Sequence, residues 1–266
     1  MIVRQTYELI KKRLGKKLEE ITVSEVRIGL YMSAVRLSDD SVGTSATFSS
    51  DYPFCSRDNR DFGLLSPSKI KGTCVTDILD SEKVSGIVLS LKMATLNALS
   101  TGLISAGGYR IIENADPLEF VDLGHGKTIT IVGAFQSYIR KISSAGNRLH
   151  VLEMNENALS SEQKKLYVPA SEYSKILPVS DIVIITGQTL VNGTIDNLLS
   201  VVSDGTKVIV TGPSSGILPD ILFENKVSII GAVRITRPDI LFDIVSEGGT
   251  GFHLFEYCAQ KICIVN

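Results

Sequence analysis

Two short apolar runs in the second half of the chain each lead directly into a Thr-Gly pair, at Thr186-Gly187 and at Thr211-Gly212. In open parallel sheets, ligands bind outside the carboxyl ends of neighbouring strands. Threonine hydroxyls and free backbone amides at such positions suit a carboxylate, phosphate or carbonyl oxygen. The pattern therefore predicts a ligand site, although it does not specify a reaction.

The residues that surround these pairs add further polar groups. Asn192 and Thr194 flank a glycine, which favours a tight turn, and either side chain could cap the helix that follows. Gly212, Pro213 and Ser214 open the next predicted helix, without the lysine of a phosphate-binding P-loop. Helix capping accounts for only part of each loop, so the remaining groups are candidates for ligand binding.

A glycine and an acidic residue occupy the corresponding places earlier in the chain. Gly133 follows a predicted strand, where a glycine lets a ligand approach the start of the next helix. The other glycines of the dinucleotide fingerprint are absent, so binding of an NAD pyrophosphate by the usual glycine-rich loop is not expected. Glu153 lies 20 residues after Gly133, the spacing at which an acidic side chain holds ribose hydroxyls. An ordinary strand-end glutamate explains Glu153 equally well.

Metal-binding and nucleophile motifs are absent from the sequence. The four cysteines and three histidines are scattered, without ligand spacing. If a metal is handled, oxygen ligands such as Glu153, Asn155 and Asp181, or a metal already held by an organic chelator, fit better. No GxSxG motif occurs, and the candidate acid–base groups are Glu153, Lys92 and the charged residues 57–61. Whether the protein is an enzyme stays open at this point.

The C-terminal half alternates strand-like and helix-like patterns. Residues 156–179 are irregular, and the tail after 252 is ambiguous between helix and edge strand. Such alternation indicates a doubly wound parallel sheet with right-handed crossovers. Strands are predicted at 127–132, 148–154, 182–186, 207–211 and 227–232, and helices at 135–144, 193–202, 217–224 and 238–246.

The N-terminal half has a different organisation. An amphipathic helix is predicted for residues 4–18, an antiparallel strand pair for 23–35 and 41–48, and a small-residue-rich helix for 85–106. Thr47 and Asn97 are more polar than packing requires, and we expect them to face the C-terminal loops. The polar connector at 114–126 marks a domain boundary, which gives domains 1–122 and 123–266.

Composition excludes several functional classes. The chain has 266 residues, of which 44% are hydrophobic, and a net charge of −2. This charge does not indicate a nucleic-acid partner, because phosphate binding needs clustered Lys and Arg, and the one basic cluster, at 11–17, is expected to be a solvated helix face. No run approaches the roughly 18 apolar residues of a membrane span, and no signal peptide is recognised. A reduced cytoplasmic protein is the simplest interpretation, and the sequence leaves room for a homo-oligomer.

Four strings in the sequence resemble one protein family. They are GLYMSA at 29–34, NAL at 97–99, TGQTLVNGT at 186–194 and TGPSSGILPDILF at 211–223. The chain is similar to the family known as "putative heavy-metal chelation", and the likeness covers nearly its whole length. The resemblance implies an α/β protein with an N-terminal α+β domain like that of enolase and a C-terminal Rossmann-like domain. It also implies a site between the two domains.

These observations lead to three functional hypotheses. The first is a protein that binds a small-molecule or metal-chelate ligand in an interdomain cleft and handles heavy metal or a metal chelator. The alternative is a transferase or lyase that uses a nucleotide-type cofactor such as S-adenosylmethionine, with Glu153 on the ribose. The third is a delivery module without chemistry of its own. The residues assign no cofactor directly. The candidate ligand-binding residues are Thr47, Asn97, Gly133, Glu153, Thr186, Gly187, Asn192, Thr194, Gly212, Pro213 and Ser214.

Overall fold

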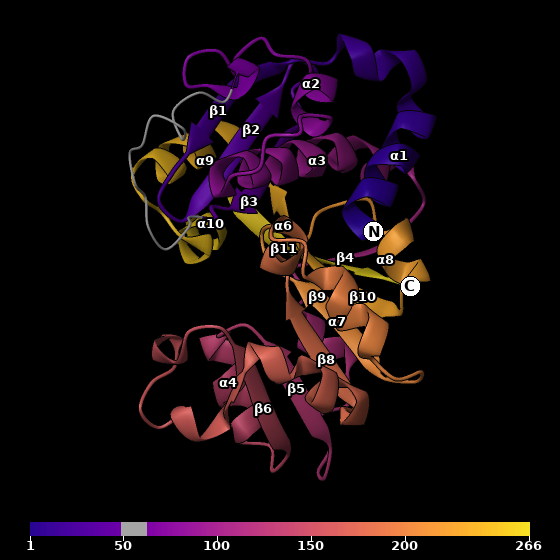
Figure 1. Ribbon diagram of the computed structural model, residues 1–266, viewed down its shortest axis with the longest axis vertical. Helices are drawn as coiled ribbons and strands as arrows, with labels where there is room; N and C mark the ends of the chain where they lie inside the picture. Colours follow the sequence, from indigo (N-terminus) through magenta and orange to yellow (C-terminus); the bar gives the residue numbers. More distant parts are fainter. Residues whose placement is uncertain (49–62) are drawn as a thin grey trace.

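The computed structural model of this 266-residue protein describes residues 1–48 and 63–266. The described strands form a three-stranded sheet near the N-terminus and an eight-stranded sheet from the rest of the chain. Figure 1 shows the small sheet in the upper part of the molecule and strands β5, β6 and β8 of the large sheet in the lower part. The candidate acid–base groups at 57–61 lie outside the described residues.

The small sheet is an antiparallel meander of β1 (Val23–Ile28), β2 (Met32–Leu37) and β3 (Val42–Ala46). The single strand predicted across 23–35 is wrong, because the chain turns back at residues 29–31. The Gly29 N–H donates to the Met32 carbonyl over 2.8 Å at this turn. Only glycine fits there, since a Cβ atom would lie 2.1 Å from the Val245 carbonyl oxygen.

Three α-helices accompany this sheet in the described part of the N-terminal region: α1 (Ile2–Leu14) precedes it in the chain, and α2 (Val75–Leu79) and α3 (Gly86–Ala106) follow it. Helix α3, which the sequence pattern predicted as helical, packs on β2 and β3. Its length and apolar composition would allow it to cross a membrane. This corrects the expectation that no segment of the chain is long and apolar enough to do so. However, 67% of its most apolar window is buried inside the protein, so it serves here as a core helix.

The large sheet combines a parallel region with two antiparallel strands at one edge. The spatial order of the strands is β7-β6-β5-β8-β9-β10-β11-β4, and neighbouring strands from β7 to β10 run parallel. Strand β11 then pairs antiparallel with β10, and β4 pairs antiparallel with β11. Counted from β5 as the first strand, the parallel order is that of dinucleotide-binding folds. The strands are β4 (Arg110–Glu113), β5 (Thr128–Val132), β6 (Arg148–Glu153), β7 (Tyr167–Pro169), β8 (Ile182–Thr186), β9 (Lys207–Thr211), β10 (Val227–Ile235) and β11 (Ala259–Val265).

Helices cover both faces of the parallel region, as a doubly wound sheet requires. Ile139 of the first crossover helix packs with Ile129 and Ile131 on one face. Leu198 of a later crossover helix packs with Val183 and Ile185 on the other face. The helices of this region are α4 (Gln136–Ser143), α5 (Tyr173–Ile176), α6 (Gln188–Val191), α7 (Ile195–Val201) and α8 (Asp220–Glu224).

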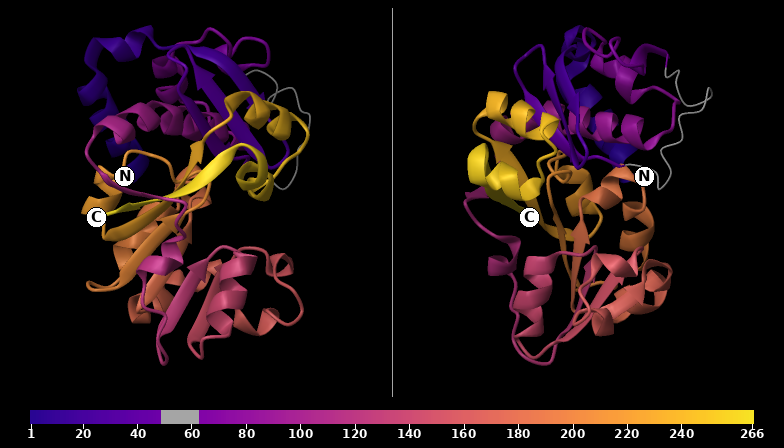
Figure 2. Two further views of the ribbon diagram at one scale, coloured as in Figure 1. Left: turned by 180° about the vertical axis from the view of Figure 1, so that it is seen from behind. Right: turned by 90° about the vertical axis from the view of Figure 1, so that its left-hand side faces the viewer.

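The C-terminus returns to the small sheet. Helix α9 (Pro238–Ser246) contacts β1 and β2, and Leu241 and Leu254 share a buried cluster with Met32 and Ala34 of β2. Helix α10 (Gly251–Tyr257) then leads into β11. Figure 2 shows the yellow helices beside the indigo strands, while β11 runs along β10. The small sheet is therefore enclosed by α3 on one face and by these C-terminal helices on the other.

The ambiguous tail resolves into both a helix and an edge-side strand, because β10 offers β11 an unpaired edge. Strand β4 extends the same sheet by pairing with β11. The predicted division into domains 1–122 and 123–266 stays a prediction, and β4 is a segment before residue 122 that lies in the large sheet.

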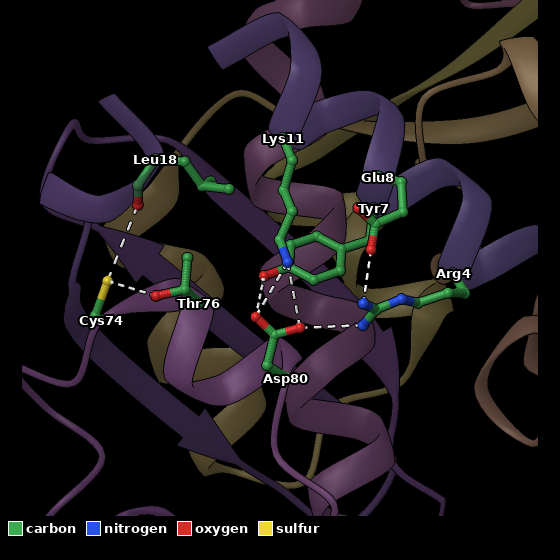
Figure 3. A network of polar contacts seen from close by, with 8 residues as sticks. All are labelled: Arg4, Tyr7, Glu8, Lys11, Leu18, Cys74, Thr76 and Asp80. Carbon is green, nitrogen blue, oxygen red and sulfur yellow. Dashed lines mark hydrogen bonds and ion pairs between the residues drawn. The ribbon is translucent and has the colours of Figure 1, made fainter. Parts of the chain in front are cut away.

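Helix α1 is fastened to the rest of the N-terminal region by polar contacts around Asp80, which follows α2 (Figure 3). The Asp80 carboxylate accepts from Arg4 at 3.0 Å, from the Tyr7 hydroxyl at 3.0 Å and from Lys11 at 3.2 Å. Lys92 of α3 donates to the nearby Ser81 carbonyl. Burial lowers the pKa of the Lys92 ammonium, and its hydrogen bond to Ser81 places this side chain beside the polar contacts around Asp80.

Candidate functional site

The carboxyl ends of the parallel strands meet at one edge of the large sheet. Thr186 at the end of β8 pairs with Thr211 at the end of β9, and Val132 at the end of β5 pairs with Leu152 of β6. The strand order reverses between β5 and β8, which is the place where open α/β sheets bind ligands. The predicted convergence of the Thr-Gly loops at one sheet edge is thus present in the structure.

A cavity of about 380 Å³ opens at this reversal, and we call it the switch-point cavity. Its floor is apolar, formed by Val132, Leu152 and Leu198, and its rim carries hydroxyl, amide and carboxylate groups. Phe48 reaches the cavity from the N-terminal region. The complete lining is Phe48, Val132, Gly133, Leu152, Glu153, Met154, Ala170, Ser171, Tyr173, Thr186, Gln188, Thr189, Asn192, Thr194, Asn197 and Leu198.

Gly133 and Glu153 lie side by side on the cavity wall, because β5 and β6 are neighbours. The Gly133 N–H donates to the Leu152 carbonyl over 2.9 Å. One carboxylate oxygen of Glu153, Oε1, accepts from the backbone N–H groups of Met154 at 2.8 Å and Asn155 at 3.2 Å. These two bonds fix the direction of the side chain, while the other oxygen, Oε2, makes no hydrogen bond with the described residues. Asp181, another proposed oxygen ligand, lies at the opposite end of β8 and cannot join Glu153 in one site.

The Asn192 and Thr194 side chains form one hydrogen-bonded unit on the rim. Asn192 Oδ1 accepts from the Thr194 hydroxyl at 2.7 Å and from the Thr194 N–H at 3.1 Å. Thr194 therefore does not cap α7 with its side chain. The preceding polar segment is not a plain loop, because residues 188–191 form the short helix α6. Its buried Thr189, Leu190 and Val191 explain why this stretch becomes helical.

The loop after β9 joins the two halves of the molecule. The Thr44 hydroxyl donates to the Pro213 carbonyl at 3.1 Å, and the Ala46 N–H donates to Ser214 Oγ at 2.8 Å. Asn97 of α3 donates to the Thr44 carbonyl at 2.6 Å and more weakly to that of Pro213. Ser214 is 1% exposed and Asn97 is 4% exposed, so these polar groups are used in contacts between the halves.

Five of the predicted binding residues line the switch-point cavity: Gly133, Glu153, Thr186, Asn192 and Thr194. The other six do not. Thr47 donates to the Gly29 carbonyl at 2.8 Å, and Gly187 packs so closely on Ser215 that a Cβ atom would lie 2.9 Å from its nitrogen. The neighbour of Thr47, Phe48, forms the wall that sequence analysis had expected from Thr47 and Asn97.

A smaller second cavity of about 170 Å³ lies at the same sheet edge on the side of β9 and β10. Gly212 and Pro213 line it, together with Asp116, Tyr138 and Lys261. Sequence analysis did not single out the last three, because Asp116 and Lys261 are 145 positions apart and no local pattern links them. Ser171, Tyr173 and Asn197 of the switch-point cavity were missed for the same reason.

Asp116 and Lys261 form an ion pair of 3.1 Å in the second cavity, with side chains 21% and 49% exposed. Burial favours the neutral carboxyl, but bonds from the Leu118 N–H, Tyr138 and Lys261 outweigh it and lower the pKa of Asp116. Burial and the neighbouring Asp116 charge raise the pKa of the Tyr138 phenol. Tyr138 is therefore a hydrogen-bond donor at neutral pH.

Neither cavity suits a heavy-metal ion bound directly by the protein. Such ions prefer thiolate and imidazole ligands, whereas the described residues that line each cavity include one carboxylate and no Cys or His. Across residues 1–48 and 63–266, no three His, Cys, Asp or Glu side chains are grouped to hold a metal ion.

The strand order and the cavity at the strand reversal define a Rossmann-like α/β protein. The family comparisons then place it more closely. A family model described as "Putative heavy-metal chelation" matches residues 116–264, and a second model with the same description matches residues 11–100. The chain belongs to this family, which confirms the resemblance found in its sequence. A comparison with curated proteins gave no match.

Solved structures of the same family share the fold. A protein of unknown function from the DUF364 family of Pyrococcus horikoshii is 19% identical and covers 100% of both chains, with a TM-score of 0.80. A second DUF364 protein of unknown function, from Desulfitobacterium hafniense, is 19% identical, covers 99% of this chain and 100% of its own, and has a TM-score of 0.74. These likenesses confirm the predicted fold class.

Proposed function

We propose that the switch-point cavity binds a small organic ligand with adjacent hydroxyl groups, of the nucleoside type. The observation that carries this proposal is the position of Glu153 at the end of β6, beside Gly133 at the end of β5. In dinucleotide-binding folds an acidic side chain at this place accepts hydrogen bonds from a ribose. One oxygen of Glu153 is already oriented by two backbone N–H groups, which leaves the other oxygen for the ligand.

The remaining lining fits the same class of ligand. An apolar floor with aromatic side chains from Phe48 and Tyr173 suits a flat heterocyclic ring. The amide groups of Gln188 and Asn197 on the rim suit the polar edge of such a ring. A volume of about 380 Å³ falls within the roughly 300–1,000 Å³ of typical small-molecule sites.

The family description suggests a role in metal handling, and we assign that role to an organic ligand of the cavity. The cavity lining offers hydroxyl, amide and single carboxylate groups, which bind organic molecules better than soft metal ions. On this proposal, the protein binds or modifies a metal chelator or its precursor.

Adenosine is the simplest probe of the proposal, and titration calorimetry measures its affinity. The Glu153→Gln variant should weaken adenosine binding about tenfold or more, because a hydrogen bond to a charged group contributes about 1.5–3 kcal/mol. Glu156→Gln is the matched control, since Glu156 is exposed, pairs with Lys164 and does not line the cavity.

A second variant tests the rim. Asn192→Ala removes the acceptor of the Thr194 hydroxyl and should also weaken adenosine binding. Absence of adenosine binding by the unmodified protein at millimolar ligand would refute the proposal. Equal affinities of the Glu153→Gln and Glu156→Gln variants would refute the role of Glu153.

A further inference from the structure

We infer that the ligand of the switch-point cavity carries a zwitterionic arm, with an amino and a carboxylate group, and that this arm enters the second cavity. The inference rests on the proposed function, because the second cavity then receives one end of the same molecule. It identifies the ligand class as a nucleoside joined to an amino acid.

The two cavities occupy the two halves of one sheet edge. Gly133 lines the switch-point cavity, and Phe135, two residues later in the same turn, lines the second cavity. Thr186 lines the first, and its paired residue on the next strand, Thr211, lines the second. Neighbouring parallel strands are about 4.8 Å apart, so a ligand needs to extend by only a few bonds to reach from one cavity to the other.

The backbone between the cavities carries little side-chain bulk. Gly133 and Gly212 both have positive φ angles, 104° and 126°, which glycine adopts without strain. At Gly212 the position of a Cβ atom has only the Gly187 nitrogen nearby, at 3.8 Å. A ligand can therefore pass close to the main chain at this crossing.

The charges of the second cavity match a zwitterion. Lys261 and Asp116 both line it and form a neutral pair, and the lysine side chain is 49% exposed. A ligand carboxylate can pair with the Lys261 ammonium while the ligand amino group pairs with Asp116. Ser137 and Thr211 place hydroxyl groups in the same cavity, and the Lys261 ammonium lies 5.5 Å from the centre of the Phe255 ring.

A pyrophosphate arm fits this charge distribution poorly. Among residues 1–48 and 63–266, Lys261 is the only Lys or Arg that lines either cavity, and Asp116 already balances its charge. Two phosphate charges would therefore be bound beside Asp116 without a free cation. The size also fits an amino-acid arm, since a cavity of about 150 Å³ holds a molecule of benzene size and this cavity measures about 170 Å³.

Calorimetry with S-adenosylhomocysteine and adenosine tests the inference, because the two probes share the nucleoside and differ in the zwitterionic arm. S-adenosylhomocysteine should bind about tenfold or more tightly than adenosine, the gain expected from one hydrogen-bonded charge pair. Lys261→Met should remove most of that gain and leave adenosine affinity unchanged. Lys226→Met is the matched control, because Lys226 also pairs with an aspartate, at 3.0 Å, and does not line either cavity.

Each outcome has a separate meaning. Equal affinity for the two probes would overturn the zwitterionic arm and leave the nucleoside site standing. A gain that Lys261→Met and Lys226→Met reduce equally would overturn the location of the arm. Tighter binding of NAD than of S-adenosylhomocysteine would overturn the charge argument, and no binding of any probe would overturn the proposed function and the arm together. Lys261 is half exposed on β11, so its replacement should leave the fold intact, which a thermal melt of the variant verifies.

Discussion

Replacement of Asp80 by Asn should destabilise the protein by about 1–2 kcal/mol at neutral pH. The two ion pairs, to Arg4 and Lys11, are partly exposed, with side-chain exposures of 57% and 32% against 42% for Asp80. Each such pair contributes about 0.2–1 kcal/mol after solvent screening. The hydrogen bond from the more buried Tyr7 hydroxyl, at 3.0 Å, adds about 0.5–1.5 kcal/mol. Asparagine keeps the shape of the side chain and part of its hydrogen bonding, so the lower half of the combined range is expected.

The effect of Asp80→Asn should depend on pH in a defined direction. Burial raises the pKa of Asp80, but hydrogen bonds from Lys11, Tyr7 and Arg4 outweigh it, and the net pKa lies below the ordinary 3.8. A carboxylate whose pKa is lowered by folding stabilises the protein above its unfolded pKa, and that contribution disappears as the pH falls through the folded pKa. The unfolding free energies of the two proteins should therefore differ at pH 7 and converge in acid.

Urea unfolding at a series of pH values, followed by circular dichroism, measures both quantities. Asp77→Asn is a matched control, because Asp77 is an exposed aspartate of α2 close to Asp80 in the chain. A difference between the unmodified protein and Asp80→Asn that stays constant from neutral to acid pH would refute the charge-based account. A difference no larger than that of Asp77→Asn would refute the role of the network in Figure 3.

Two further predictions concern buried groups. Ser214→Ala should lower the unfolding free energy by about 1–3 kcal/mol, because the Ala46 N–H loses its acceptor. The same variant should leave adenosine affinity unchanged. Weaker adenosine binding without a lower unfolding free energy would instead make Ser214 a ligand-binding residue. Cys263 should resist alkylation by iodoacetamide at pH 8 until the protein unfolds, because burial and the nearby Asp116 raise the pKa of its thiol to about 12. Mass spectrometry that finds Cys263 alkylated in the folded protein would contradict this prediction.

The sequence predicted the parallel region of the large sheet and the strand ends that form the site. Apolar runs of strand length alternate with helical patterns there, and each run is short, continuous and bounded by turn residues. These signals are local, so Gly133, Glu153, Thr186 and Asn192 could be placed at one edge without coordinates. The Glu153 position followed from its spacing after Gly133 alone.

Where the sequence prediction was wrong, contacts between distant segments determined the structure. The turn at Gly29 depends on the close approach of Val245, and the final strand forms because β10 offers it an edge. Asn97 and Ser214 were predicted from their polarity as ligand-binding residues, and in the structure both join α3 and β3 to the loop after β9.

The sequence by itself thus determined the fold class, the family and one wall of the switch-point cavity, because hydrophobic periodicity and strand-end residues are encoded over a few adjacent positions. Only the tertiary structure brought Phe48 to the other side of that cavity and Lys261 to Asp116. Those pairings depend on how sheets and helices pack across long separations in the chain, and no local pattern records which distant side chains will meet.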